Sequence, residues 1–83
     1  MIIKKEQQYL MDGTNEECFE FTLTRYFAFN DRTVTYRYNL YKNLNKNSVF
    51  ELKKLCKYIG LNNYSKLDKS ELIELITQCI IFE

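Results

Sequence analysis

The chain has 83 residues, of which 46% are apolar and 28% charged, and its 12 basic and 11 acidic residues leave a formal net charge of +1. This length predicts one folded domain with a small core, and the 16% of aromatic residues excludes a disordered chain. The near-zero net charge excludes a strong overall attraction to nucleic acid or to an anionic membrane, so any basic binding surface must be local.

The sequence contains three cysteines, Cys18, Cys56 and Cys79, and no histidine. Because it has no CxxC pair and no His ligand, the usual zinc-binding spacings are excluded, and widely spaced cysteines in odd number are typical of reduced thiols. The N-terminal residues lack the apolar core of a signal peptide, and no apolar run reaches the roughly 18 residues of a membrane span. We therefore expect an intracellular protein of the cytoplasm or nucleus, with no metal, no cofactor and no membrane contact.

Residues 1–41 are predicted to form antiparallel strands. A weakly marked strand ends at Met11, and the sequence DGTNE at 12–16 predicts a turn. Apolar and polar residues then alternate over 18–29, and the alternation resumes over 34–40. These patterns predict a β-hairpin, or a three-stranded meander if the first strand joins it.

The alternation also predicts a register for the hairpin. A two-residue turn at Asp31 and Arg32, or a four-residue loop of the same register, places every apolar residue on one face. In this register the opposed pairs are Phe29 with Val34, Phe27 with Tyr36, Arg25 with Tyr38 and Leu23 with Leu40, and on the outer face Arg37 with Tyr26. For these Arg–Tyr contacts a structural cation–π role is favoured over the stacking of bases.

Residues 42–47 are predicted as a polar linker to two amphipathic helices. Ser48 and Glu51 predict a capping box at the start of the first helix, and Gly60 predicts its left-handed end. The apolar arc of this helix is predicted to contain Val49, Leu52, Leu55, Cys56 and Ile59, with Phe50 and the lysines Lys53, Lys54 and Lys57 on the opposite side.

The second helix begins with the same kind of cap, formed here by Asp68 and Glu71. Its inner arc is predicted to contain Leu72, Leu75, Ile76 and Cys79. Residues 80–82 are too apolar to lie free in solvent, so we expect them to pack on the sheet or on a partner. The whole pattern predicts a single α+β domain over 1–83, in which the sheet of residues 1–41 packs on the helical residues 48–83.

The run LKKLCKYIGLNNYSKLDKSELIELI resembles the helix–extended-loop–helix superfamily, which includes SAP domains, LEM domains and the N-terminal module of the transcription terminator Rho. The shared pattern is a helix ending in Gly-Leu, a loop, and a Lys-x-x-Leu-Ile opening of the next helix, here Gly60-Leu61 and Lys69 to Ile73. The loop is longer than in a typical SAP domain and closer in length to the Rho type. The resemblance covers residues 48–79, and the N-terminal hairpin is not part of it.

Members of this superfamily bind DNA, RNA or other proteins, so the resemblance implies nucleic-acid binding, with DNA favoured over RNA, through the first helix and the loop. The placement of charge agrees, because residues 42–69 hold seven lysines against Glu51 and Asp68. The predicted contact residues are Lys53, Lys54, Lys57, Asn62, Asn63, Tyr64, Lys66 and Lys69. Free amides at the start of the second helix are a further phosphate site, for which Asp68 would compete.

Other interpretations stay open at this point. The lysines can be a solvated helix face, and Tyr64 or Leu67 can fasten the loop to the core. A second function is a small viral or phage factor that binds a host protein through the hairpin, with Tyr26 and Arg37 as contacts. A third is a subunit whose apolar tail is buried by a neighbour. The absence of histidine, of paired carboxylates and of a glycine-rich phosphate loop predicts that the chain is not an enzyme.

Overall fold

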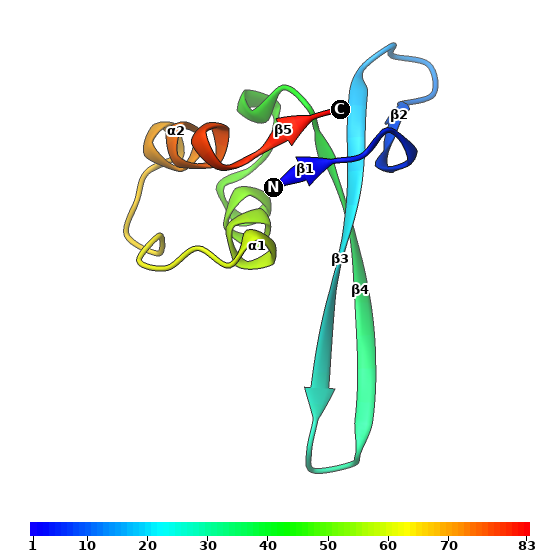
Figure 1. The fold of residues 1–83 in the computed structure, drawn as a ribbon, viewed down its shortest axis with the longest axis vertical. Helices are drawn as coiled ribbons and strands as arrows, with labels where there is room; N and C mark the ends of the chain where they lie inside the picture. The colour runs from blue at the N-terminus through cyan, green and yellow to red at the C-terminus, as the bar shows by residue number, and fades with distance from the viewer.

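A three-stranded antiparallel meander is followed along the chain by two packed helices, in a computed structural model that describes residues 1–83 (Figure 1). The meander contains β2 (Gln8–Leu10), β3 (Glu17–Phe27) and β4 (Arg32–Tyr41), in that order. The helices α1 (Val49–Ile59) and α2 (Lys69–Cys79) lie beside one end of the sheet, and the hairpin of β3 and β4 projects beyond them. The predicted α+β fold class is thus confirmed in its meander form. Neither helix is long and apolar enough to cross a bilayer.

The hairpin register differs from the prediction. The structure pairs Phe19 with Leu40 and Phe27 with Arg32, so the connecting loop contains residues 28–31. Only Asp31 in this loop takes a positive φ, of 49°. Both predicted loops, the two-residue turn at Asp31 and Arg32 and the four-residue loop of the same register, were wrong. Asp-Arg is not the Asn-Gly or Gly-containing pair that two-residue hairpin turns favour.

The corrected register changes the predicted cross-strand pairs but leaves the two faces of the hairpin as predicted. Arg25 opposes Val34 and Arg37 opposes Thr22, so neither Arg–Tyr pair forms. The face assignment survives because the pairing moved by an even number of residues, and side chains alternate between faces with period two. The one residue displaced from its face is Phe29, which lies in the loop and is 86% exposed.

The two ends of the chain form a second, separate sheet. The strand β1 (Ile2–Ile3) pairs in parallel with β5 (Ile81–Phe82), and a short 3₁₀ turn, η1 (Lys5–Gln7), leads from β1 into β2. The ring of Phe82 packs edge-on against Phe19 of β3 at 5.3 Å between centroids. The expectation that the apolar tail packs on the sheet is confirmed for Phe82, and the terminal pairing itself was not predicted.

The segment between the sheet and α1 is more ordered than a polar linker. It contains a 3₁₀ turn, η2 (Leu44–Lys46), whose Leu44 is buried, and it ends at a buried Asn47. The Asn47 side chain accepts a hydrogen bond from the backbone N–H of Tyr41 (2.8 Å) and donates one to the Tyr41 carbonyl (2.9 Å). Asn47 therefore takes the place of a partner strand at the end of β4.

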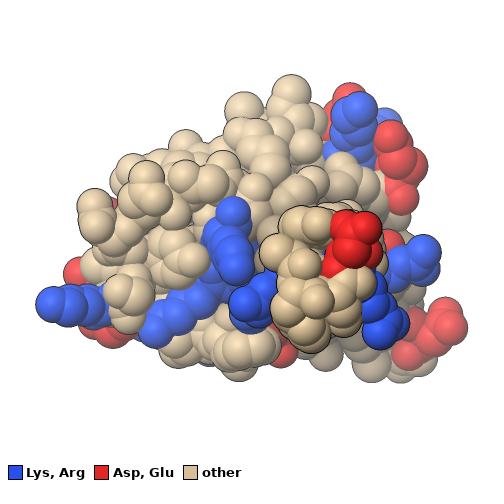
Figure 2. All heavy atoms as spheres, turned by 90° about the horizontal axis from the view of Figure 1, so that it is seen from below, with Lys and Arg blue, Asp and Glu red and all other residues tan.

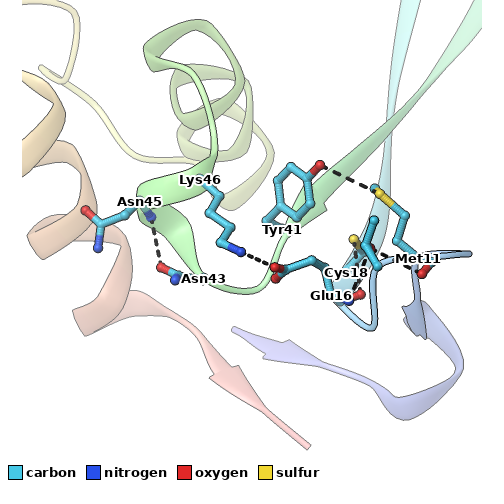
Figure 3. Close-up of polar contacts among 8 residues, drawn as sticks. Met11, Glu16, Cys18, Tyr41, Asn43, Asn45 and Lys46 are labelled. Carbon is cyan, nitrogen blue, oxygen red and sulfur yellow. Dashed lines mark hydrogen bonds and ion pairs between the residues drawn. The ribbon is translucent and has the colours of Figure 1, made fainter.

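Polar contacts also join η2 to the turn between β2 and β3 (Figure 3). The ammonium of Lys46 forms an ion pair with Glu16, and the hydroxyl of Tyr41 points at the sulfur of Met11 across 3.7 Å. Within η2 the backbone N–H of Asn45 donates to the side chain of Asn43 at 3.3 Å. The Lys46–Glu16 ion pair thus holds η2 against this turn, and the contact of Tyr41 with Met11 joins the turn to the end of β4.

Both helices begin and end where the sequence predicts. The Ser48 hydroxyl accepts the backbone N–H of Glu51 at 3.2 Å, and Asp68 and Glu71 form the full reciprocal capping box. Gly60 ends α1 in the left-handed conformation, with φ of 92°, which costs glycine little. The predicted helix starts and the glycine stop are confirmed, although the cap at Ser48 is one-sided.

The core lies between the base of the hairpin and the two helices. Its buried residues come from every part of the chain: Ile3, Phe19, Phe21, Leu40, Leu44, Leu52, Leu55, Cys56, Leu72, Ile76 and Ile80. Most of the predicted helix arcs are therefore confirmed. Val49, the first residue of α1, is exposed instead, and Ile59, Leu75 and Cys79 are half-buried.

Candidate nucleic-acid interface

A groove of about 290 Å³ separates the projecting hairpin from α1. Three of its eight lining residues are basic, namely Arg25 on β3 and Lys54 and Lys57 on α1, and none is acidic. The others are Leu23, Thr24, Tyr36, Tyr38 and Phe50. Viewed along the hairpin, Lys and Arg side chains gather between the hairpin and the helices (Figure 2). The groove thus combines positive charge with aromatic surface.

The floor of the groove is fixed to the core. The ring of Tyr38 stacks on Phe21 at 5.3 Å and 22°, and Phe21 stacks in turn on Tyr58 of α1 at 4.9 Å and 20°. This row of rings ties the hairpin to the helix, because stacked aromatic pairs contribute about 0.5–1.5 kcal/mol each beyond their buried area. The separation of the two walls is set by this packing.

The walls of the groove carry its exposed aromatic side chains. Tyr36 on β4 is 42% exposed and Phe50 on α1 is 63% exposed. The Lys54 ammonium lies 5.0 Å from the centroid of the Phe50 ring, and the guanidinium of Arg25 lies 5.1 Å from that of Phe27. These cation–π contacts hold the charged groups beside aromatic faces without neutralising them.

The positive charges of the groove have no carboxylate partner. The two ion pairs of the molecule join Lys42 to Glu17 and Lys46 to Glu16, on the sheet side of η2. The seven lysines counted over residues 42–69 therefore do not form one surface. Two of them are paired with acids elsewhere, whereas Lys54 and Lys57 are left to act with Arg25 from the hairpin.

Two other predicted contact lysines have structural partners. The ammonium of Lys53 donates to the carbonyl of Ser65 at 3.0 Å and so braces the loop against α1. Lys69 donates to the carbonyl of Asn45 at 2.7 Å and points toward η2, away from the groove. Lys66 is exposed in the loop. The predicted lysine set is thus divided among three places.

The loop between the helices forms a second depression of about 490 Å³, next to the end of α1. Its lining includes the predicted residues Lys57, Asn62, Asn63 and Tyr64. Tyr64 is half-buried and packs against the core, which agrees with the structural alternative for this residue. Lys57 lines both this depression and the groove, so the two adjoin at this side chain.

The start of α2 is a poor phosphate site. Asp68 accepts the N–H of Glu71 at 2.9 Å, and the Glu71 carboxylate accepts the N–H of Asp68 at 3.2 Å. This capping box brings two carboxylates to the amides that a phosphate oxygen would need. The sequence-based suggestion of a phosphate at this helix start is therefore not supported.

Tyr26 and Arg37, the residues predicted for a protein partner, lie on the opposite face of the hairpin from the groove. Tyr26 is 60% exposed, and its hydroxyl donates to the Asp31 carboxylate at 2.6 Å. This hydrogen bond raises the pKa of Tyr26 above its ordinary value. Tyr26 opposes Thr33 and Arg37 opposes Thr22, so the two residues do not form a joint site.

Two of the three cysteines are weak nucleophiles at neutral pH. Burial raises the pKa of the Cys18 thiol, and the nearby Glu16 raises it further. Burial also raises the pKa of Cys56, with a smaller contribution from Cys79. A raised pKa keeps a thiol protonated, and the thiolate is the reactive form. Both side chains therefore act as core residues.

For Arg25 and Tyr38, on the hairpin side of the groove, sequence reasoning favoured a structural role over base stacking. It did not consider Tyr36 or Phe50 as contact residues. One signal for the hairpin side was present, since Arg25 is the lone charge on the apolar face of the predicted hairpin. A charge on a face that packs against a helix points to the edge of the packed region, where that face becomes accessible. The approach of this face to α1 is a tertiary contact.

Comparisons with known proteins add no assignment, because no family model, no curated protein and no solved structure matches this chain significantly.

Proposed function

We propose that this chain is a small, non-enzymatic nucleic-acid-binding protein whose contact surface is the groove between the hairpin and α1, continued over the loop between the helices. The observation that carries the proposal is the convergence of three unpaired basic side chains, Arg25, Lys54 and Lys57, in a groove without an acidic residue. Phosphates are the natural partners of such a cluster, because each contact releases a counterion from the nucleic acid.

The helix–loop–helix half supports the same proposal in a second way. The resemblance to the helix–extended-loop–helix superfamily rests on Gly60-Leu61, the loop and the Lys69 to Ile73 opening, which are the end of α1, the connecting loop and the start of α2. DNA is the favoured ligand on that resemblance. The polar side chains of Asn62 and Asn63 at the loop are suited to hydrogen bonds with sugar, phosphate or base edges.

The proposal is tested with a salt series of binding to labelled DNA and RNA oligonucleotides, measured by fluorescence anisotropy. With about three phosphates neutralised, the affinity should fall roughly 20- to 40-fold between about 50 and 200 mM salt. The double variant Lys54→Glu with Lys57→Glu should lose binding. Lys53 is left unchanged because it braces the loop through Ser65.

The control is the double variant Lys4→Glu with Lys5→Glu, which makes the same change in net charge. Both lysines are exposed and lie near the terminal sheet rather than the groove. This control should bind within about twofold of the unmodified chain at equal salt, since distant exposed charges are screened within about 10 Å. Equal losses in the two double variants would contradict a local site, and no binding at low salt would end the proposal.

A second candidate is a protein-binding module that uses the projecting hairpin. This candidate is supported by the unpaired outer edges of the hairpin. β2 pairs only with Glu17–Phe19 of β3, and no other strand lies beside β3 or β4. Phe29 is exposed at the tip. Unpaired strand edges can accept a strand from another protein. This alternative predicts that salt-sensitive nucleic-acid binding is absent and that Tyr26→Ala or Arg37→Ala prevents recovery of one stoichiometric protein partner.

A further inference from the structure

We infer that the ligand of the groove is single-stranded nucleic acid, held with one base stacked on the exposed aromatic walls, Tyr36 and Phe50, and with its phosphates on the three basic residues. This inference rests on the proposed function and narrows it from nucleic acid in general to one form. Its basis is that a purely phosphate-binding surface has no use for exposed aromatic rings, and this groove has them on both walls.

Stacking needs a base whose face is free. In a duplex, each base face is covered by the neighbouring base pairs, so a protein meets only base edges and phosphates. In a single strand the faces are accessible, and they stack on Tyr, Phe or Arg side chains. Exposed aromatic walls next to cations without a carboxylate partner are therefore typical of a site for single-stranded nucleic acid.

The dimensions of the groove favour the same ligand. Its volume of about 290 Å³ is at the lower end of small-ligand pockets, which span roughly 300–1,000 Å³ and enclose most of a bound molecule. A single nucleoside fits this scale. The hairpin forms one wall of the groove and projects past α1 (Figure 1).

The positions of the charges complete the site. Lys57 lies at the junction of the groove and the depression of the loop, where Asn62 and Asn63 are accessible. A strand that enters the groove beside Arg25 and Lys54 can continue past Lys57 onto the loop. The groove and the adjoining depression together offer contacts for more than one nucleotide, and single-strand modules take about 4–16.

The experiment compares three oligonucleotides of about 12 units by fluorescence anisotropy at low salt: oligothymidylate, an abasic strand with the same phosphates, and a duplex. The unmodified chain should bind oligothymidylate at least tenfold more tightly than the abasic strand or the duplex. Tyr36→Ala should lower the affinity for oligothymidylate on the order of tenfold and leave the abasic strand unaffected. Tyr36→Phe, which keeps the ring, should restore binding.

The matched control is Tyr26→Ala, which removes an exposed tyrosine from the other face of the same hairpin. It should leave all three affinities unchanged. A partly exposed side chain such as Tyr36 contributes little to folding, and the unchanged affinity of its alanine variant for the abasic strand shows that the fold is intact.

The outcomes separate the inference from the proposed function. Equal binding of duplex and oligothymidylate, with no effect of Tyr36→Ala but loss of binding in the Lys54→Glu, Lys57→Glu variant, would overturn the single-strand inference and leave the proposed function standing. Absence of binding to all three oligonucleotides would overturn both. A loss in Tyr26→Ala equal to that in Tyr36→Ala would also overturn the inference, since it would place the contact outside the groove.

Discussion

Asn47 is the residue on which the junction of the two halves depends most. It is buried, it lies just before the cap of α1, and its side chain pairs with both backbone groups of Tyr41 at the end of β4. A buried backbone group that loses its partner costs about 1–3 kcal/mol. One asparagine thus completes the edge of the sheet immediately before Ser48, the cap residue of the first helix.

Replacing Asn47 with alanine should lower the free energy of unfolding by about 2 kcal/mol, because two hydrogen bonds at Tyr41 lose their partner together. The measurement is the urea midpoint, with the slope of the transition unchanged. Asn45→Ala is the control, since Asn45 is exposed and its contacts with Asn43 and Lys69 use backbone atoms. A loss as large for Asn45→Ala would contradict the role given to Asn47.

At the scale of elements, the hairpin divides into an anchored base and a free arm. The base contains the buried Phe19, Phe21 and Leu40, whereas residues 22–37 contain no buried side chain. Backbone pairing continues along the whole length, out to Phe27 and Arg32. Leu23 still packs against the core, and the arm beyond it is held by its ladder hydrogen bonds and by contacts within the hairpin, including the pair of hydroxyls at Thr24 and Thr35, 3.2 Å apart.

Hydrogen exchange should separate these two parts of the hairpin. Amides in the arm should exchange through local opening, at a lower free energy than amides at Phe19, Phe21 and Leu40, which should require global unfolding. The measurement is native-state exchange by NMR or mass spectrometry. Equal protection along the hairpin would contradict the division. Protection of the Tyr36 amide should rise when oligothymidylate fills the groove.

At the scale of the whole molecule, the ends of the chain close the core. The parallel pair β1–β5 brings Phe82 onto Phe19 and leaves Ile81, its neighbour, 66% exposed. The backbone N–H of Ile81 donates to the carbonyl of Met1 at 2.7 Å. Ile80 and Phe82 are thus covered by their own chain, and Ile81 is the residue of the tail that stays exposed.

Phe82→Ala should lower the free energy of unfolding by about 2 kcal/mol, because it removes a half-buried ring from the core. Ile81→Ala, in the same strand but pointing outward, should change it by less than about 0.5 kcal/mol. Thermal unfolding followed by circular dichroism measures both. The opposite order of the two effects would show that the exposed face of the tail, rather than Phe82, carries the stability.

Most of the local structure follows from short-range patterns in the sequence. Ser48, Gly60 and Asp68 mark the helix ends through contacts within one turn, and the alternation over 18–29 and 34–40 indicates the faces of the hairpin. The hairpin register was missed because an even shift preserves every face, so hydrophobic pattern alone does not distinguish the two pairings. The conformation of the loop, in which Asp31 is left-handed, decides between the two pairings.

The candidate site was predicted in part. Lys54 and Lys57 could be identified because helical spacing places them on one face, and Asn62, Asn63 and Tyr64 because they follow the glycine end of α1. The partners of Lys53 and Lys69 are carbonyls of residues 12 and 24 positions away, which no local pattern indicates.

The sequence by itself determined the fold class, the two helices with their caps, and the faces of the hairpin, because each depends on contacts between residues a few positions apart. Only the tertiary structure decided that Arg25 and Tyr36 meet Lys54 and Phe50 across a groove, and that the two ends of the chain pair. The physical reason is that packing of the core sets how far the hairpin lies from α1 and how close the two chain ends come. Residues far apart in the chain meet where Phe21, Tyr38 and Tyr58 stack.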